Sequence, residues 1–306
     1  MDILDIVKEE YGLREVSWME NPFILLTDSG CKRIRYWADE SLLKWHTEWR
    51  DEAGKKDGPM LDRMIRTKKG ESRISVNKQW ITLHDSCIEP FGLLGNEKQW
   101  GALVAKILAA GEMEARGLEV LAETDEFDFQ SLLELAKPVA SSGGSFSLIR
   151  MSLTEARKRA VQANKLIELA GNSVPPLLDP QLSTDSGRKV MDFLFYEAGD
   201  QMPVRTYKPL RRFLQEWIAA CGTPSLKRLL TAADRDYPLH SEQGFLLAAE
   251  IMIPWELKEC LLNLQGGDLE EAVSSLDRFS REWEINRRLL MAVTEWMDEN
   301  RKKVAL

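Results

Sequence analysis

The sequence is poor in the residues that bind metals and form cross-links. Its 306 residues include 4 cysteines and 3 histidines. Clustered Cys and His ligands are needed for a structural zinc site, and here no CxxC or CxxH pair occurs. We therefore expect no metal site, and reduced thiols as in a cytoplasmic protein. The cysteines are Cys31, Cys87, Cys221 and Cys260, and the histidines are His46, His84 and His240.

Long apolar runs and the features of a leader peptide are also missing. No stretch reaches the ~18 apolar residues of a membrane span. The first residues, MDILDIVKEEYGL, are acidic and lack a basic segment followed by an apolar one. The sequence predicts neither a membrane span nor a signal peptide, and we expect the protein in the cytoplasm.

Two common catalytic signatures are absent as well. No G-x-x-x-x-G-K-[ST] phosphate loop and no G-x-S-x-G nucleophile turn occurs. Gly30 is the only glycine between Glu20 and Ala53, and a single glycine cannot supply a row of close backbone amides for a phosphate. The glycine-rich stretch at 141–145 contains no lysine and is interpreted as a connector.

The charge of the chain is acidic but unevenly distributed. The formal net charge is −8, which argues against a dedicated nucleic-acid binder. Between Lys32 and Arg73, 12 basic and 8 acidic residues give +4, whereas between Glu112 and Lys137, 2 basic and 8 acidic residues give −6. The basic stretch could meet a phosphate or an acidic partner, and the alternative is that both are solvated surfaces.

The first third of the chain predicts a small sheet with one helix. Apolar runs around the turns Thr27–Gly30 and Thr67–Gly70 predict two hairpins, and a last strand follows at Trp80–Leu83. Between them, 39–52 has its apolar residues at helical spacing, with Asp39 as the N-cap.

After His84 the signals are mainly helical. A capping box at Ser152–Glu155 predicts a helix start, and Pro138 predicts a helix end. No substantial sheet is expected after residue 180. The predicted helical ranges are 96–110, 127–135, 152–171, 188–198, 207–220, 225–233 and 268–300.

These elements describe an α+β chain with two lobes, an N-terminal sheet lobe at 1–84 and a helical lobe at 85–306. This is the layout of the protein-kinase-like and aminoglycoside-phosphotransferase-like folds. The segments ILLTDSGCKRIRYWADESLLKWHTEWRDEAG, RMIRTKKGESRISVNKQWITLHD and YPLHSEQGFLLAAEIMIPWELKECLLNL resemble the spore-coat CotS family of endospore-forming bacteria, including its YutH and YsxE branches. The resemblance rests on the two T-x-x-G turns and on the Pro-Leu and apolar-Pro-aromatic steps of the last segment.

The resemblance implies positions for the residues of phosphoryl transfer. The strand lysine falls on Arg35 and the helix glutamate on Glu48, for which a surface ion pair is the alternative. The catalytic loop H-G-D-x-x-x-x-N is matched to 147–157, where Ser152 replaces the aspartate and Arg157 the asparagine. Asp179 is the candidate metal carboxylate, and the alternative is a loop residue that caps a turn.

Two functional hypotheses follow from the resemblance. The first is a pseudokinase that binds no cofactor and serves as a structural or scaffolding protein in sporulation and spore-coat assembly. Its partners would be other coat or sporulation proteins, and it would lie in the cytoplasm or the spore coat. The alternative is a divergent phosphotransferase that uses ATP and Mg²⁺ on a small molecule or a coat protein.

Overall fold

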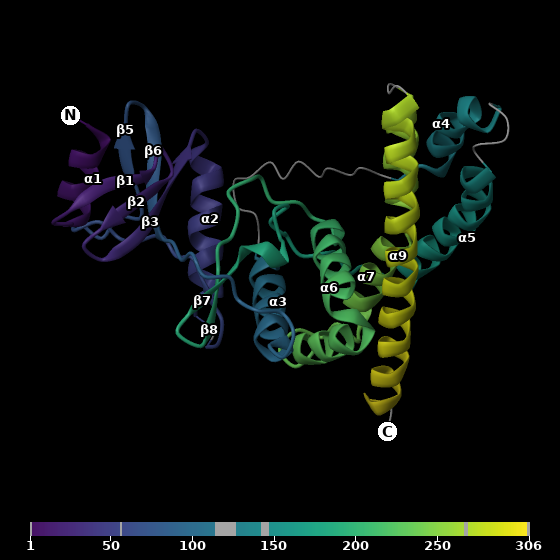
Figure 1. Cartoon of the computed structure of the whole chain (residues 1–306). Coiled ribbons are helices and arrows are strands. Elements are labelled where there is room, and N and C mark those ends of the chain that lie inside the picture. Colours follow the sequence, from purple (N-terminus) through teal and green to yellow (C-terminus); the bar gives the residue numbers. More distant parts are fainter. Residues whose placement is uncertain (1, 56, 114–126, 142–146, 266–268, 305–306) are drawn as a thin grey trace.

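A computed structural model of the chain describes residues 2–55, 57–113, 127–141, 147–265 and 269–304. Its N-terminal lobe is built on an antiparallel five-stranded sheet in the order β1-β2-β3-β6-β5, with helix α1 against one face (Figure 1). The turns Asp28-Ser29 and Asn77-Lys78 join β2 to β3 and β5 to β6. The bounds are α1 Ile3–Tyr11, β1 Val16–Glu20, β2 Ile24–Thr27, β3 Gly30–Trp37, β5 Ile74–Val76 and β6 Gln79–Asp85.

Helix α2 (Glu40–Ala53) joins the two lobes. Asp39 caps it as predicted, because its side chain accepts hydrogen bonds from the N–H groups of Ser41 and Leu42. The rings of Trp45 and Trp49 stack with their centroids 5.5 Å apart and belong to the main core of the helical lobe. Trp45 and Trp49 thus pack toward the helical lobe, where α2 contacts α3, while Leu43 packs with Trp37 of β3 on the side of the sheet.

The rest of the chain is largely helical. Helix α3 packs on α6, α5 on α7, and the long α9 runs past α6, α7 and α8 (Figure 1). No helix in the described ranges is both long and apolar enough to cross a membrane. The bounds are α3 Glu97–Gly111, α4 Phe129–Ser141, α5 Ser147–Ala170, α6 Lys208–Ala233, α7 Glu242–Met252, α8 Trp255–Leu264 and α9 Leu269–Val304.

A second, three-stranded sheet corrects the helix predicted at 188–198. Strands β7 (Gly187–Val190) and β8 (Phe193–Tyr196) form a hairpin, and the short β4 (Met60–Leu61) adds to β8 in parallel. The hairpin reverses at Met191, whose φ of 55° is incompatible with a continuing helix. The prediction of no substantial sheet after residue 180 therefore missed this hairpin.

Other differences concern where elements begin and end. Ser152 and Glu155 lie inside α5, so they form no capping box, and α4 continues through Pro138. The predicted hairpin around 67–70 is a turn only, since its first strand is reduced to a single bridge between Met64 and His84. The two helices predicted at 207–220 and 225–233 form one element with a kink at Gly222.

Candidate functional site

Arg35 lies at the interface between the lobes, on strand β3. Its Nη1 donates to Asp200 Oδ2 at 3.0 Å, and its Nη2 lies 3.4 Å from Asp62 Oδ2. The same nitrogen also donates to the carbonyl of Ala198. The side chain is only 10% exposed. The guanidinium thus connects β3 to the 198–200 segment, and its two terminal nitrogens are bound to this chain's own oxygens, while its Nε has no hydrogen-bond partner.

The side chain of α2 that faces Arg35 is a second cation, Arg50, and not Glu48. Arg50 is fully buried and donates from Nε to Asp62 Oδ1 at 3.2 Å. Its Nη2 donates to the carbonyl of Gly199 at 2.6 Å. Glu48 lies on the outer side of α2, half exposed, with Lys44 as its partner at 3.9 Å. The structure therefore does not bring Glu48 and Arg35 together.

Asp62 is the carboxylate that these two arginines share. It follows directly after β4, is fully buried, and also accepts the N–H of Ala198 at 3.1 Å. Burial raises its pKa, while Arg50 and Arg35 oppose that effect. Asp62 thus completes an Arg35–Asp62–Arg50 bridge that connects three separate segments of the chain.

Two neutral histidines surround the bridge. His46 Nδ1 lies 2.7 Å from Arg50 Nη1, and His84 Nδ1 lies 3.4 Å from Asp62 Oδ2. Burial, together with the positive charge of Arg50, holds the pKa of both imidazoles well below the usual value of 6.5. Both rings are therefore uncharged at neutral pH.

A second set of ion pairs connects the strand lobe to the segment that follows β8. Glu197 accepts Arg33 Nη2 at 3.0 Å and lies 3.7 Å from Arg188 Nε. Its Oε1 also accepts the Ser86 hydroxyl at 3.1 Å and the Cys87 N–H at 3.2 Å. The chain that leads from β6 into the helical lobe is thus held by a carboxylate of that lobe.

Asp179 lies at the base of the same region and is 1% exposed. Its Oδ1 accepts the Gln181 N–H at 2.8 Å, which is a turn-capping bond, and its Oδ2 accepts the N–H of Gly199. A Cβ on Gly199 would lie 2.6 Å from Asp179 Oδ1, so only glycine allows this approach. Both oxygens of the candidate metal ligand are therefore engaged by backbone N–H groups.

Ser152 and Arg157 do not approach this region through any described contact. They lie within α5, where Ser152 is buried and Arg157 is exposed. The stretch at 147–157, to which the catalytic loop is matched, is continuous helix in the structure. The short apolar run before the β7–β8 hairpin is Leu177-Leu178, and the residue after it is Asp179. Counted from Asp179, the H-G-D-x-x-x-x-N pattern would have Leu177 and Leu178 at the histidine and glycine and Thr184 at the asparagine.

These contacts define what we call the interlobe cluster. Four cations and four carboxylates balance one another, so the cluster carries no formal net charge. Among the described residues, no group of His, Cys, Asp and Glu has the arrangement needed to hold a metal ion. Its members are Arg33, Arg35, Arg50, Arg188, Asp62, Asp179, Glu197 and Asp200.

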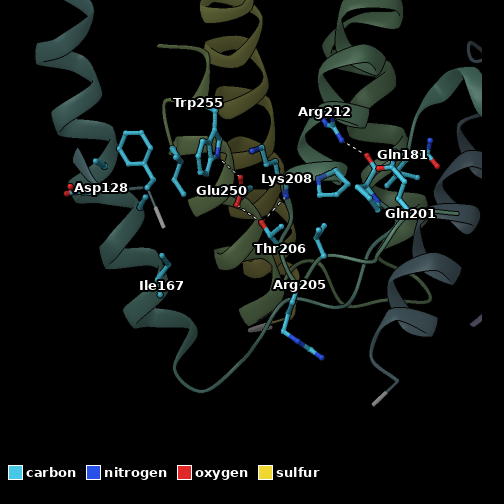
Figure 2. A pocket seen from close by; sticks show the side chains of 18 of the residues that line it. Asp128, Ile167, Gln181, Gln201, Arg205, Thr206, Lys208, Arg212, Glu250 and Trp255 are labelled. Carbon is cyan, nitrogen blue, oxygen red and sulfur yellow. Dashed lines mark hydrogen bonds between the residues drawn. The ribbon is translucent and has the colours of Figure 1, made fainter. Parts of the chain in front are cut away.

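A large cavity of about 1070 Å³ adjoins this region on the helical side (Figure 2). The loop after Asp179 forms one wall through Pro180–Ser183, and α5 forms another. Trp255 and Thr206 both donate to Glu250, at 2.7 and 2.9 Å, and this group of side chains lines the cavity (Figure 2). The cavity is large enough for a small-molecule ligand. No local sequence pattern predicts it, because its walls come from segments far apart in the chain.

The basic stretch of the strand lobe is largely paired within the chain. Asp51 binds both Arg63 and Arg66, and Arg73 pairs with Glu40 at 2.5 Å. Lys69 lies 3.3 Å from Glu10 and remains 73% exposed. The acidic stretch at 112–137 falls in part outside the described residues. All four cysteines are free thiols.

Compared with solved structures, the chain has the fold of the protein-kinase-like aminoglycoside phosphotransferases. It is similar to an aminoglycoside phosphotransferase from Alicyclobacillus acidocaldarius with a TM-score of 0.67 at 10% identity, covering 96% of this chain and 95% of that one. It is also similar to a spectinomycin phosphotransferase in its AMP-bound complex, with a TM-score of 0.53 at 12% identity, covering 95% and 97%. No family model matches the sequence, and no curated protein matches it. The two-lobed α+β fold expected from the sequence is thereby confirmed.

Proposed function

We propose that the protein is a kinase-fold pseudoenzyme that acts by binding other molecules and not by phosphoryl transfer. The observation that carries this proposal is the Arg35–Asp62–Arg50 bridge. Phosphoryl transfer needs a cation available to the phosphates and carboxylates available to the metal. Here Arg35 is bound to Asp62, Asp200 and the Ala198 carbonyl, and both oxygens of Asp179 accept backbone N–H groups.

The test is the binding of ATP with Mg²⁺, measured by thermal unfolding and by calorimetry. A ligand at a hundredfold excess over its Kd adds ~2.7 kcal/mol of stability, which is a visible shift in Tm. We expect no shift beyond the error of measurement. A shift that requires magnesium would contradict the proposal.

The second candidate is a divergent ATP-dependent phosphotransferase that acts on a small molecule. The comparisons favour this candidate, because the similar structures are phosphotransferases, one of them bound to ADP and spectinomycin. The large cavity beside the Asp179 loop is the feature of this chain that supports it. ATP with Mg²⁺ would then be the cofactor, and the substrate would occupy the cavity.

Turnover separates the two candidates. A phosphotransferase should lose ATP-dependent phosphorylation of its substrate in Asp179→Asn, while the matched control Asp185→Asn, an exposed residue of the same loop, should stay active. We expect no turnover from any of the three proteins. Turnover that disappears only in Asp179→Asn would establish the enzyme.

For the biological role we propose spore-coat assembly, on the strength of the sequence resemblance to the CotS family. Coat or sporulation proteins would be the partners, and the exposed Lys68 and Lys69 of the strand lobe would contribute to binding. The experiment is a pull-down with purified coat proteins. We expect Lys68→Glu with Lys69→Glu to weaken capture and Asp179→Asn to retain it. The opposite result would favour the enzyme.

A further inference from the structure

The large cavity of about 1070 Å³ has an apolar side, which α4, α5 and the residues before α4 form. Phe127, Phe129 and Ile167 line the cavity there. The two phenylalanines are half-buried, and Ile167 is 46% exposed, so these side chains are open to a ligand. Apolar surface that a ligand covers is removed from water, and this favours binding. This side of the cavity therefore suits an apolar group.

The opposite side of the cavity carries open N–H donors. Figure 2 shows Arg212, Gln181 and Gln201 next to one another, away from Ile167, and all three residues are exposed. Arg212 donates from Nη2 to the carbonyl of Pro180, which leaves its Nε and Nη1 for a ligand. Gln181 Oε1 accepts the backbone N–H of Asp200 at 3.1 Å, so its amide nitrogen remains a donor. Donors that converge around a guanidinium in this way suit an anionic group.

No carboxylate of the chain neutralises Arg212. In the ranges that the structure describes, its guanidinium forms no ion pair. Glu216, four residues further along α6, is engaged by the loop after Asp179. Its Oε2 accepts the hydroxyl groups of Ser183 and Thr184, at 3.0 and 2.9 Å. The positive charge of Arg212 is therefore available to a ligand.

The other two carboxylates that line the cavity already have donors from this chain. Asp128 accepts two backbone N–H groups of the first turn of α4, at 2.9 and 2.8 Å, and so caps that helix. Glu250 is 9% exposed and accepts the indole N–H of Trp255 at 2.7 Å. A cationic ligand would compete with these donors, whereas an anionic ligand meets donors that are open. The cavity therefore favours an anion.

We propose that this cavity binds an amphipathic organic anion, with an apolar body and a carboxylate at one end. The carboxylate accepts two parallel hydrogen bonds from the guanidinium of Arg212, a geometry that the two groups share. The amides of Gln181 and Gln201 lie beside it, and the apolar body covers Ile167 and the two phenylalanines. This proposal rests on the function proposed above, because it names the ligand class that a binding protein or a phosphotransferase would hold in the cavity.

Calorimetric titration of the full chain with phenylbutyrate, without nucleotide, tests the proposal. Phenylbutylamine has the same ring and chain length with the opposite charge, and butyrate has the carboxylate without the ring. Arg212→Met removes the charge and keeps an unbranched side chain, and Ile167→Gln changes the apolar side. The matched control is Arg235→Met, an exposed arginine after the end of α6 that does not line the cavity.

We expect phenylbutyrate to bind the wild type and Arg235→Met equally, and to bind Arg212→Met about tenfold more weakly. Ile167→Gln, phenylbutylamine with the wild type, and butyrate with the wild type should each give weaker binding as well. The proposal is overturned if phenylbutyrate does not bind, if Arg212→Met binds it as the wild type does, or if the amine or butyrate binds as tightly. None of these outcomes alters the nucleotide titration or the pull-down, so the ligand class and the proposed function fail separately.

Discussion

Replacement of Asp62 by asparagine tests whether the interlobe cluster stabilises the protein. Asp62 is fully buried between Arg50, Arg35 and the N–H of Ala198, at 3.2, 3.4 and 3.1 Å. Asparagine has nearly the same size but no charge. Asp62→Asn therefore leaves two buried guanidiniums facing each other without the carboxylate that they share.

The expected loss is large because Asp62 and Arg50 are fully buried. Removing one partner of a buried ion pair costs ~3–5 kcal/mol, whereas an exposed pair contributes ~0–1 kcal/mol. The matched control is Asp51→Asn, since Asp51 also binds two arginines, Arg63 and Arg66, but at the surface. Urea unfolding followed by tryptophan fluorescence measures the stability of both variants.

The reasoning is refuted if Asp62→Asn loses no more stability than Asp51→Asn. A further variant separates the charge from the packing. Asp62→Leu combined with Arg50→Met replaces both members of the Arg50–Asp62 pair by apolar side chains of similar volume. This double variant should recover part of the stability lost in Asp62→Asn, because neither position then carries a buried charge without a partner. Equal stability of the double variant and Asp62→Asn would show that shape, not charge, determines the effect.

Three further predictions concern the same region. The pKa values of His46 and His84 lie well below 6.5 in the folded protein, so the unfolded chain binds protons more tightly at these two residues. The free energy of unfolding should therefore be highest above pH 6.5. Below that pH it should decrease by up to ~1.4 kcal/mol per pH unit for each histidine. Urea unfolding on either side of pH 6.5 checks this, and a flat profile contradicts it. Gly199→Ala places a Cβ 2.6 Å from Asp179 and should cost ~1–3 kcal/mol in the same assay, while Gly92→Ala, whose Cβ would meet Asn96 at 3.5 Å, should cost little. Glu48→Gln should change stability by less than ~0.5 kcal/mol, and a larger loss would mean that Glu48 has a structural role.

The sequence allowed the position of α2 to be predicted, but the residue chosen on it was wrong for a geometric reason. Trp45 and Trp49 lie four residues apart and define the buried face. His46 and Arg50 are also four apart and adjoin that face, so both are buried. Glu48 was selected by its distance along the chain from Arg35, which carries no information about helical phase.

The sequence predicts a helix at 188–198, where the structure has the β7–β8 hairpin. Residues Gly187–Val190 and Phe193–Tyr196 are short strands, and Arg188, Lys189 and Asp192 give them no clear alternation. The parallel partner β4 is only two residues long and comes from the other lobe. Such a long-range pairing leaves no local signal, so Asp62, which follows β4, could not be linked to Arg35 from the sequence.

The interlobe cluster also determines how nucleotide binding has to be measured. A phosphate that approaches Arg35 must first displace Asp62 or Asp200. If this breaks a buried ion pair, the cost is ~3–5 kcal/mol, and since ~1.4 kcal/mol corresponds to a factor of ten, the affinity falls by about two to three and a half orders of magnitude. A micromolar site would thereby become a millimolar one. The ATP titration must therefore extend to millimolar concentrations. Asp62→Asn removes the carboxylate that both arginines share, although Arg35 keeps its ion pair with Asp200, and this variant should bind ATP more tightly than the wild type if the cluster is what blocks the site.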